Sequence, residues 1–140
     1  MEGAVKKTIV TFDDVIVLSS DISGMVIVCS QVSAMWWEPA GDKVSITISV
    51  CGQNSHFFLD KSVVDFIFKR MRIYQEKDQN KVYWTDSLMI ASNKIAFLML
   101  SDEMQKLRVV FRDSTKLDLG RSREEALHLF KVLSKHVANT

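Results

Sequence analysis

A chain of 140 residues with 47% apolar and 25% charged residues has the composition of a globular protein and is too apolar for a disordered segment. It is long enough to bury a sizeable core, which favours a single domain over residues 1–140. Its 18 basic residues nearly balance its 17 acidic ones, so it lacks the basic excess typical of general nucleic-acid or membrane-surface binders.

The N-terminal third contains short apolar segments separated by turn residues. Residues 15–18 and 25–29 are apolar on both faces, and such strands are either covered on both sides or expose an adhesive surface. Asp13 and Asp14 interrupt any signal-peptide pattern, and no run reaches the roughly 18 apolar residues that span a bilayer. We therefore expect a nuclear or cytoplasmic protein without a transmembrane segment.

Two cysteines and two tryptophans lie in the next strand-like stretches. Cys29 and Cys51 have no CxxC spacing, which favours reduced thiols, although a disulfide stays possible. Trp36 and Trp37 are adjacent just before Pro39, and neighbouring residues of an extended segment point to opposite faces. Either one of them is partly exposed or packed under a loop, or both pack in the core around a bend. Exposed tryptophans would be favourable anchors for a protein partner.

Residues 44–50 form the clearest predicted strand, in which branched aliphatic residues alternate with hydroxyl residues, so that one face is buried and one is wet. Residues 107–112 repeat the pattern, with Leu107, Val109 and Phe111 pointing inward. Residues 95–100 are apolar on both faces. The sequence shows no internal repeat and no low-complexity segment.

Residues 57–74 are ambiguous. Ser62 and Asp65 have the spacing of a capping box, and a helix from there would place Val63, Val64, Ile67 and Met71 on one face. The β-rich composition of the same stretch instead favours a strand. We expect a strand that ends near residue 59, followed by a short helix or turn.

The C-terminal segment predicts an amphipathic helix of about four turns. Ser122 and Glu125 form a capping box, and the apolar residues that follow recur at helical spacing. About seven antiparallel strands closed by such a helix predict a mainly β, pleckstrin-homology-like sandwich or barrel.

Catalytic and cofactor motifs are absent from the sequence. None of the five glycines belongs to a GxGxxG motif or a P-loop, and the three histidines are scattered without acidic or thiol companions at ligand spacing. We therefore expect no enzyme, no cofactor and no metal site.

The basic residues offer two weaker signals. Lys69, Arg70 and Arg72 form the strongest local charge, either as a solvated face or as a docking patch for an acidic peptide or phosphate backbone. The hairpin at residues 18–24 has no base, so phosphoinositide binding would depend on Lys6 and Lys7.

From about Trp37 onward the chain is similar to the pleckstrin-homology-like accessory proteins of meiotic double-strand-break formation. The resemblance is carried by residues 43–50, Gly52, His56-Phe57-Phe58, residues 106–111, Ser122-Arg123-Glu124-Glu125-Ala126-Leu127 and Leu133-Ser134-Lys135-His136-Val137. Members of this family usually continue into a long tail with a partner-binding segment that this sequence does not contain. The resemblance implies a scaffold that docks short peptide segments of other proteins in meiotic DNA recombination.

The sequence therefore predicts a non-catalytic protein-binding scaffold, with a phosphoinositide- or nucleic-acid-binding module as the alternative. A sheet edge or a groove beside the helix would accept the partner peptide. The predicted partner-binding residues are Trp36, Trp37, Leu98, Leu100, Val110, Lys69, Arg70 and Arg72.

Overall fold

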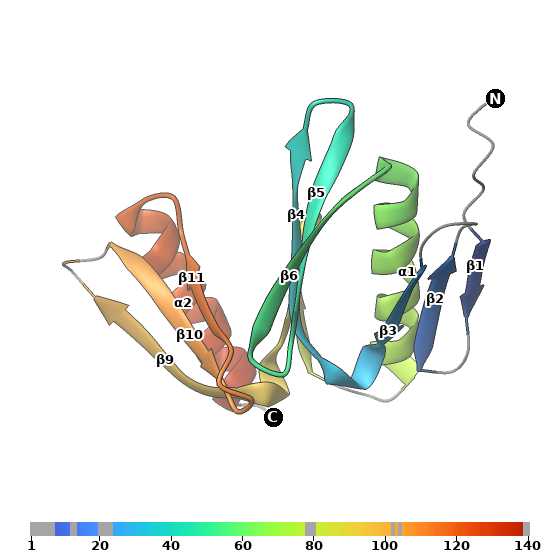
Figure 1. The fold of residues 1–140 in the computed structure, drawn as a ribbon. Helices are drawn as coiled ribbons and strands as arrows, with labels where there is room; N and C mark the ends of the chain where they lie inside the picture. Colours follow the sequence, from blue (N-terminus) through green and yellow to red (C-terminus); the bar gives the residue numbers. More distant parts are fainter. Residues whose placement is uncertain are drawn as a thin grey trace.

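The computed structural model describes residues 8–11, 14–19, 24–77, 81–101, 103 and 105–138. Eleven strands, two α-helices and two short 3₁₀ turns make up this part of the chain. The predicted mainly β fold with a C-terminal α-helix is confirmed. The strand count exceeds the expected seven or so, and a second long helix divides the strands into two groups (Figure 1).

The first group of elements ends with the helix that the sequence left open. It comprises β1 (Thr8–Thr11), β2 (Val15–Ser19), β3 (Gly24–Val28), η1 (Cys29–Gln31), β4 (Val32–Ala40), β5 (Lys43–Val50), β6 (Gln53–Leu59) and α1 (Lys61–Lys77). The second group comprises β7 (Val82–Trp84), β8 (Leu88–Ala91), η2 (Ser92–Lys94), β9 (Ile95–Ser101), β10 (Lys106–Phe111), β11 (Lys116–Leu119) and α2 (Arg123–Ala138).

Three antiparallel sheets contain these strands. A central five-stranded sheet has the order β6-β5-β4-β8-β7, so it combines three strands of the first group with two of the second. The sheets β1-β2-β3 and β11-β10-β9 lie on opposite sides of it (Figure 1), and α1 shares a core with strands of the central sheet and of the sheet β1-β2-β3. The link between the two groups is the pairing of β4 with β8.

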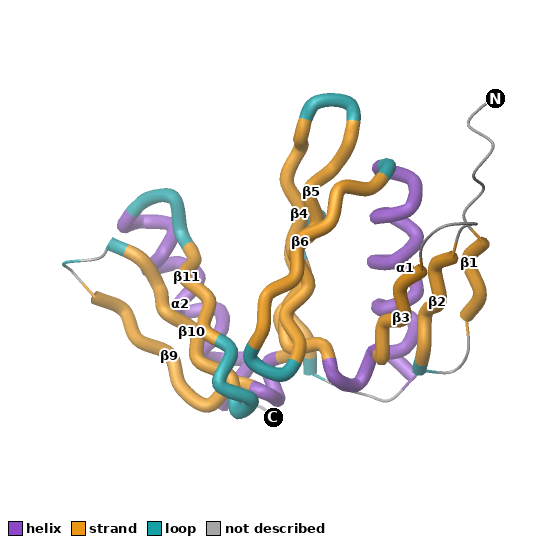
Figure 2. Tube along the Cα trace, viewed as in Figure 1, coloured by secondary structure: helices purple, strands orange, loops and turns teal. Residues whose placement is uncertain are grey.

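The same order of elements occurs twice along the chain: a hairpin, a 3₁₀ turn, three strands and a helix (Figure 2). We call residues 15–77 the first unit and residues 82–138 the second unit. In both units the amide at the start of the 3₁₀ turn donates a hydrogen bond to the backbone carbonyl of the residue before the hairpin. The Cys29 amide donates to the Asp14 carbonyl at 2.8 Å, and the Ser92 amide donates to the Lys81 carbonyl at 3.0 Å. A structural repeat therefore exists although the sequence shows none.

The strand register confirms this correspondence. Val15 pairs with Val28 in the first hairpin, as Val82 pairs with Ala91 in the second. After each 3₁₀ turn the pairing skips one residue at the same place, between Val32 and Ala34 in β4 and between Ile95 and Phe97 in β9. Val32 thus corresponds to Ile95, Ala34 to Phe97 and Val28 to Ala91.

Each helix packs on strands of its own unit, so there are two cores, and residues of the other unit complete each of them: Met89 and Ala91 in the first core, Ala34 in the second. The first core includes Ile16, Leu18, Ile27, Cys29, Val32, Met35, Ile46, Ile48, Val64, Ile67 and Met71. The second core includes Ala34, Ile90, Ile95, Leu107, Val109, Phe111, Leu117, Ala126, Leu129 and Leu133. Strand β4 contributes to both, because alternate side chains of a strand point to opposite faces.

The expectation of one wet face for residues 44–50 is wrong. Thr47 and Ser49 are buried, as are Val44, Ile46 and Ile48. Both faces of β5 are covered because the central sheet lies between the two cores. The hydroxyl groups are satisfied locally: Thr47 hydrogen-bonds His56 and Ser49 hydrogen-bonds Asn54.

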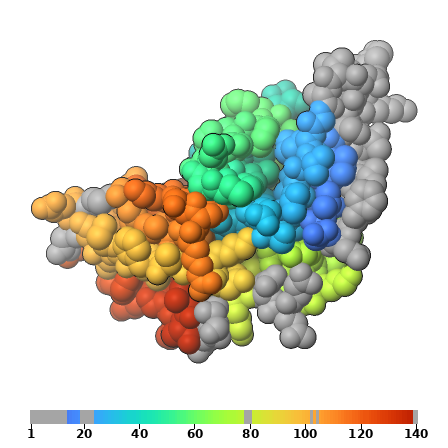
Figure 3. Space-filling view, turned by 60° about the horizontal axis from the view of Figure 1, so that its bottom comes forward, coloured from blue at the N-terminus to red at the C-terminus, as the bar shows by residue number. Residues whose placement is uncertain are grey.

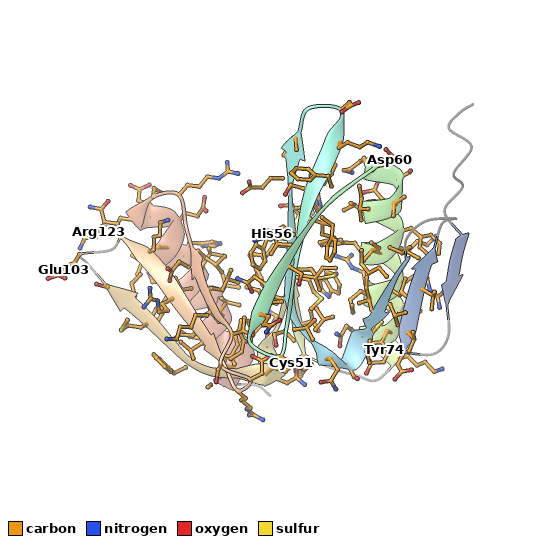
Figure 4. All side chains as sticks on the ribbon, in the orientation of Figure 1. Cys51, His56, Asp60, Tyr74, Glu103 and Arg123 are labelled. Carbon is orange, nitrogen blue, oxygen red and sulfur yellow. The ribbon has the colours of Figure 1, made fainter. Side chains whose placement is uncertain are left out.

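The ambiguous residues 57–74 are resolved as the end of β6 and most of α1. The apolar face of Val63, Val64, Ile67 and Met71 is confirmed as buried. The helix is longer than expected and begins before Ser62, since the amides of Val63 and Val64 both donate to the carbonyl of Asp60. The suggested capping box at Ser62 is therefore wrong (Asp60 is labelled in Figure 4).

The serine cap at the start of α2 is confirmed, and the returning bond from Glu125 reaches the residue before the cap. The Ser122 hydroxyl accepts the Glu125 amide at 3.2 Å, and the Glu125 carboxylate accepts the amide of Arg121 at 3.2 Å. Leu133 and Ala126 are fully buried on the strands of the second unit. Among the described residues, neither helix is long and apolar enough to cross a membrane.

A cavity in the second core is expected to destabilise the protein. Leu133→Ala removes a side chain with 0% exposure, so we expect a loss of about 2–5 kcal/mol in the free energy of unfolding. Urea denaturation followed by circular dichroism measures it. Leu127→Ala, at a position of α2 that is 41% exposed, is the matched control with an expected change of less than about 1 kcal/mol. Equal losses in the two variants would contradict this packing.

Candidate protein-binding surface

Trp36 and Trp37 pack against different cores. Both are half-buried in β4, with Trp36 against the second core and Trp37 against the first. The Trp37 indole donates to the carbonyl of Asp86 at 3.1 Å, and the Lys61 ammonium lies 4.7 Å from the centroid of a Trp37 ring. Both tryptophans therefore have structural partners within the chain, and their role as contact residues stays a prediction.

The predicted contact residues of the C-terminal sheet lie on two faces. Leu98 and Leu100 are half-buried against the second core. The exposed large apolar side chains of β9 are their neighbours Phe97 and Met99, at 51% and 40%. Val110 pairs with Phe97 and lies on the same outer face as that side chain. The alternation within residues 95–100 indicated two faces, but not which of them α2 covers.

The three basic residues of α1, Lys69, Arg70 and Arg72, differ in their exposure and contacts. Lys69 is exposed, and the Arg72 guanidinium lies 4.7 Å from the centroid of a Trp84 ring. Arg70 is half-buried, and its Nε has no hydrogen-bond partner among the described residues. Docking of an acidic partner here stays a prediction. Lys6 and Lys7, on which phosphoinositide binding would depend, lie outside the described residues.

The open edge of β3 is the site that the sequence-based list missed. This strand is the last in the order β1-β2-β3, so one of its edges has no neighbouring strand among the described residues. Val26 is 62% exposed and Val28 is 39% exposed, while Ile27 between them is buried in the first core. The available signal was the run of apolar residues at 25–29, which is typical of a covered or an adhesive strand.

A groove of about 260 Å³ lies beside this edge. It separates β3 from β5 and β6 of the central sheet, and Figure 3 shows this face of the molecule with β3 in blue and β6 in green. Its apolar lining includes Val26, Ile27, Val28, Ile48, Val50 and Phe57. We call it the β3 groove. An open strand edge with an apolar groove alongside offers both hydrogen-bonding groups and side-chain pockets to an extended peptide.

Polar contacts around η1 and the β5–β6 turn also join the two units. The Ser33 hydroxyl donates to the Asp113 carboxylate at 2.7 Å, and the Lys94 ammonium donates to the carbonyl of Ser30. The Gly52 amide donates to the Thr115 hydroxyl at 3.0 Å. Gly52 has a φ of +84°, and a Cβ there would lie 3.0 Å from the Asp113 carbonyl oxygen, so the backbones approach closely.

Burial shifts the pKa of Lys94 at this contact and the pKa of Cys29 in the first core. Partial burial lowers the pKa of Lys94, which nevertheless donates to backbone carbonyls. Burial raises the pKa of the Cys29 thiol to about 11, so this cysteine stays protonated at neutral pH and is unreactive. Cys51 is exposed at the β5–β6 turn (Figure 4), and the two cysteines are free. The described residues contain no group of three His, Cys, Asp or Glu side chains that could hold a metal ion.

Comparison with known proteins adds little. Neither protein families nor curated proteins match this sequence. Among solved structures, the LytTr DNA-binding domain of a Bacillus cereus response regulator is similar, with 15% sequence identity and a TM-score of 0.47. The match covers 86% of this chain and 96% of that domain. A likeness at this level assigns neither fold family nor function to this protein.

The Asp113 carboxylate is expected to stabilise the contact between the units in a pH-dependent way. Burial acts to raise its pKa, but hydrogen bonds from Thr115 and Ser33 outweigh it, so its pKa lies below the ordinary value. A lowered pKa stabilises the fold above the unfolded-state pKa of about 3.9, and this contribution is lost as the pH falls through the folded-state pKa. Asp113→Ala should therefore cost about 1–2 kcal/mol at pH 7, and the difference from the unmodified protein should shrink at lower pH.

Thermal denaturation between pH 3 and pH 7 measures this effect. Glu103→Ala, at an exposed turn position, is the control and should show no such dependence. A loss of stability in Asp113→Ala that is the same at every pH would contradict the electrostatic role of this carboxylate.

Proposed function

We propose that this chain is a non-catalytic protein-interaction domain whose binding site is the open edge of β3 together with the β3 groove. The observation that carries the proposal is the coincidence of an unpaired strand edge, two exposed valines and an apolar cavity of about 260 Å³ at one place. Within the part of the chain that the structure describes, Val26 and Val28 are exposed and the groove beside them is open.

The expected ligand is an extended segment with alternating apolar residues. Backbone groups of such a segment would continue the β1-β2-β3 sheet, and every second side chain would enter the β3 groove. Burying one large apolar side chain contributes about 1.5–3 kcal/mol before the cost of ordering the peptide. Two such side chains in the groove would support a weak, specific interaction.

The sequence resemblance supports a narrower proposal about the partners. It suggests that the bound segments belong to proteins of meiotic double-strand-break formation. It also suggests that this chain acts in the nucleus as a pleckstrin-homology-like scaffold for them. The alternative is a nucleic-acid- or phosphoinositide-binding module that uses Lys69, Arg70 and Arg72 of α1. These two classes differ in their response to salt, because binding to phosphates weakens steeply as the ionic strength rises.

Panning of a random peptide library on the immobilised protein tests the site. Val26→Lys places a charge at the strand edge and should weaken binding of the recovered peptides at least about tenfold, equivalent to about 1.4 kcal/mol. The matched control is Phe58→Lys, which changes a residue that is 70% exposed on β6 and does not line the groove. Fluorescence anisotropy with labelled peptides measures both.

The outcomes separate the candidate functions. Peptides with alternating apolar residues that bind the unmodified protein and Phe58→Lys, but not Val26→Lys, would support the β3 site. Equal binding to all three proteins would refute it. Affinity for phosphate-rich ligands that falls steeply with salt and is lost in Lys69→Glu would favour the alternative. Affinity purification from meiotic and non-meiotic cells then tests the narrower assignment to recombination.

A further inference from the structure

Strand β4 pairs with β8 inside the chain. Among the described residues, the strands that correspond to these two at the ends of the molecule have no such pairing. Strand β4 of the first unit pairs with β8 of the second unit, with Ala34 opposite Ile90, Met35 opposite Met89 and Trp36 opposite Leu88. By the structural repeat, β9 corresponds to β4 and β3 corresponds to β8. Both β9 and β3 are the last strands of their sheets, so each has one edge without a neighbouring strand among the described residues.

Several exposed apolar residues of β3 and β9 lie at the positions that the internal contact buries. Met89 and Ala34 are fully buried in the internal contact. Their counterparts Val26 and Phe97 are 62% and 51% exposed. Met99, the counterpart of the half-buried Trp36, is 40% exposed. The repeat thus predicts that a further strand covers the edge of β3 and the edge of β9. In the described part of the single chain, Val26, Phe97 and Met99 at these edges are exposed.

Strands β3 and β9 lack the charges and prolines that commonly protect the edges of a sheet. Strands β3 (GMVIV) and β9 (IAFLMLS) contain no charged residue and no proline. Two other edge strands are more polar: β11 (KLDL) has two charges, and β6 (QNSHFFL) begins with three polar residues. The edge strands β1 (TIVT) and β7 (VYW) resemble β3 and β9 in having neither charge nor proline. Natural proteins use charges and proline to prevent edge-to-edge association, so the sequences of β3 and β9 leave these edges able to pair with a further strand.

We propose that copies of this chain associate head to tail, with β9 of one copy added antiparallel to β3 of the next. The internal contact sets the register: Phe97 opposite Ile27, Leu98 opposite Val26 and Met99 opposite Met25 of the neighbouring copy. This inference rests on the proposed function, because it names a second copy of the chain as an occupant of the β3 groove.

The side chains fit the two cores that such a contact would join. Ala34 reaches across the internal contact into the second core, where it meets Ile90 and Val109. The corresponding place in the first core is the β3 groove, lined by Ile27 and Ile48, and Phe97 would fill it. On the other face of the contact, Val26 of one copy would lie beside Leu98 at the second core of the neighbouring copy. The equivalent residues of the internal contact, Met89 and Met35, lie together in the first core.

This contact joins two different surfaces, so it does not close on itself in a dimer. The sheets that contain β3 and β9 lie on opposite sides of the central sheet (Figure 1), which leaves both ends available at once. A contact of this kind builds rings or open chains of copies. The repeat of units inside one polypeptide would then continue from copy to copy.

The contact between copies would be weaker than the contact inside the chain. The counterpart of Ser33, which donates to Asp113, is Ala96, and the counterpart of Lys94 is Gln31. The polar contacts between the units are therefore not reproduced. The two units are also covalently linked, which gives the internal contact a high effective concentration. Association between copies should accordingly depend on protein concentration.

Sedimentation velocity and light scattering test the inference. We expect an average mass that rises above the monomer between about 10 µM and 1 mM protein. Val26→Lys and Phe97→Asp should each abolish this rise, whereas Phe58→Lys should not. Circular dichroism and thermal denaturation verify that all variants are folded. A monomer at every concentration would overturn the inference.

Mixing the two blocked variants distinguishes head-to-tail association from any symmetric contact. Phe97→Asp keeps an intact β3 edge and Val26→Lys keeps an intact β9 edge, so their equimolar mixture should form a dimer and nothing larger. No dimer in the mixture would overturn the head-to-tail arrangement.

A cysteine pair tests the register and does not depend on charged substitutions. In a Cys51→Ser background, Val26→Cys and Leu98→Cys in one chain should give a ladder of disulfide-linked oligomers on oxidation. The matched control, Val26→Cys with Phe58→Cys, should give none. Equal crosslinking in both proteins would contradict the register.

The results also separate this inference from the proposed function. A protein that is monomeric at all concentrations but binds library peptides in a Val26-dependent way would overturn self-association and leave the binding site intact. A protein that associates through β9 and β3 but binds no foreign peptide would confine the β3 groove to a second copy of the chain. Phe97→Asp, which lies outside the groove, should still bind the peptides.

Discussion

The antiparallel pairing of β4 with β8 is the contact on which the arrangement of the two units depends. It makes one continuous sheet from strands that belong to different units, and it places alternate residues of β4 in two cores. Met35 faces α1 and its neighbours, whereas Ala34 faces the strands and helix of the second unit. The contact also explains why Thr47 and Ser49 are buried, since both faces of the central sheet are covered.

The same pairing determines where the molecule is incomplete. A repeat in which each unit supplies a hairpin to the sheet of the preceding unit must leave one hairpin edge and one sheet edge unpaired at its ends. These edges are β3 and β9, and both carry exposed apolar side chains. A protein-binding role and self-association are therefore two consequences of one topology. They differ only in whether the added strand comes from another protein or from a second copy.

The residues selected from the sequence illustrate how the site could be only partly predicted. Tryptophans are frequent interface anchors, but Trp37 interacts with Asp86 and Lys61 of its own chain. Residues 95–100 were identified as apolar on both faces, yet Phe97 rather than Leu98 proves to be exposed. The reason is that α2 packs on one face of β9, and a strand of apolar residues gives no sign of which face that is. The apolar run at residues 25–29 likewise indicated either a covered or an adhesive strand, and the exposure of Val26 depends on which strands lie beside β3 in the fold.

The sequence by itself determined the mainly β class, the capped C-terminal helix, the inward face of β10 and the apolar face of α1. These features follow from local periodicity and capping chemistry, which involve residues only a few positions apart. Only the tertiary structure decided the three-sheet arrangement, the repeat of units and the location of the open edges. Strand pairing joins residues far apart in the chain, such as Met35 and Met89, and the two units share an order of elements without sharing a sequence pattern. The free energy that favours one strand pairing over another comes from burying side chains of distant segments in a common core. The local sequence pattern of each strand does not specify which segments share that core.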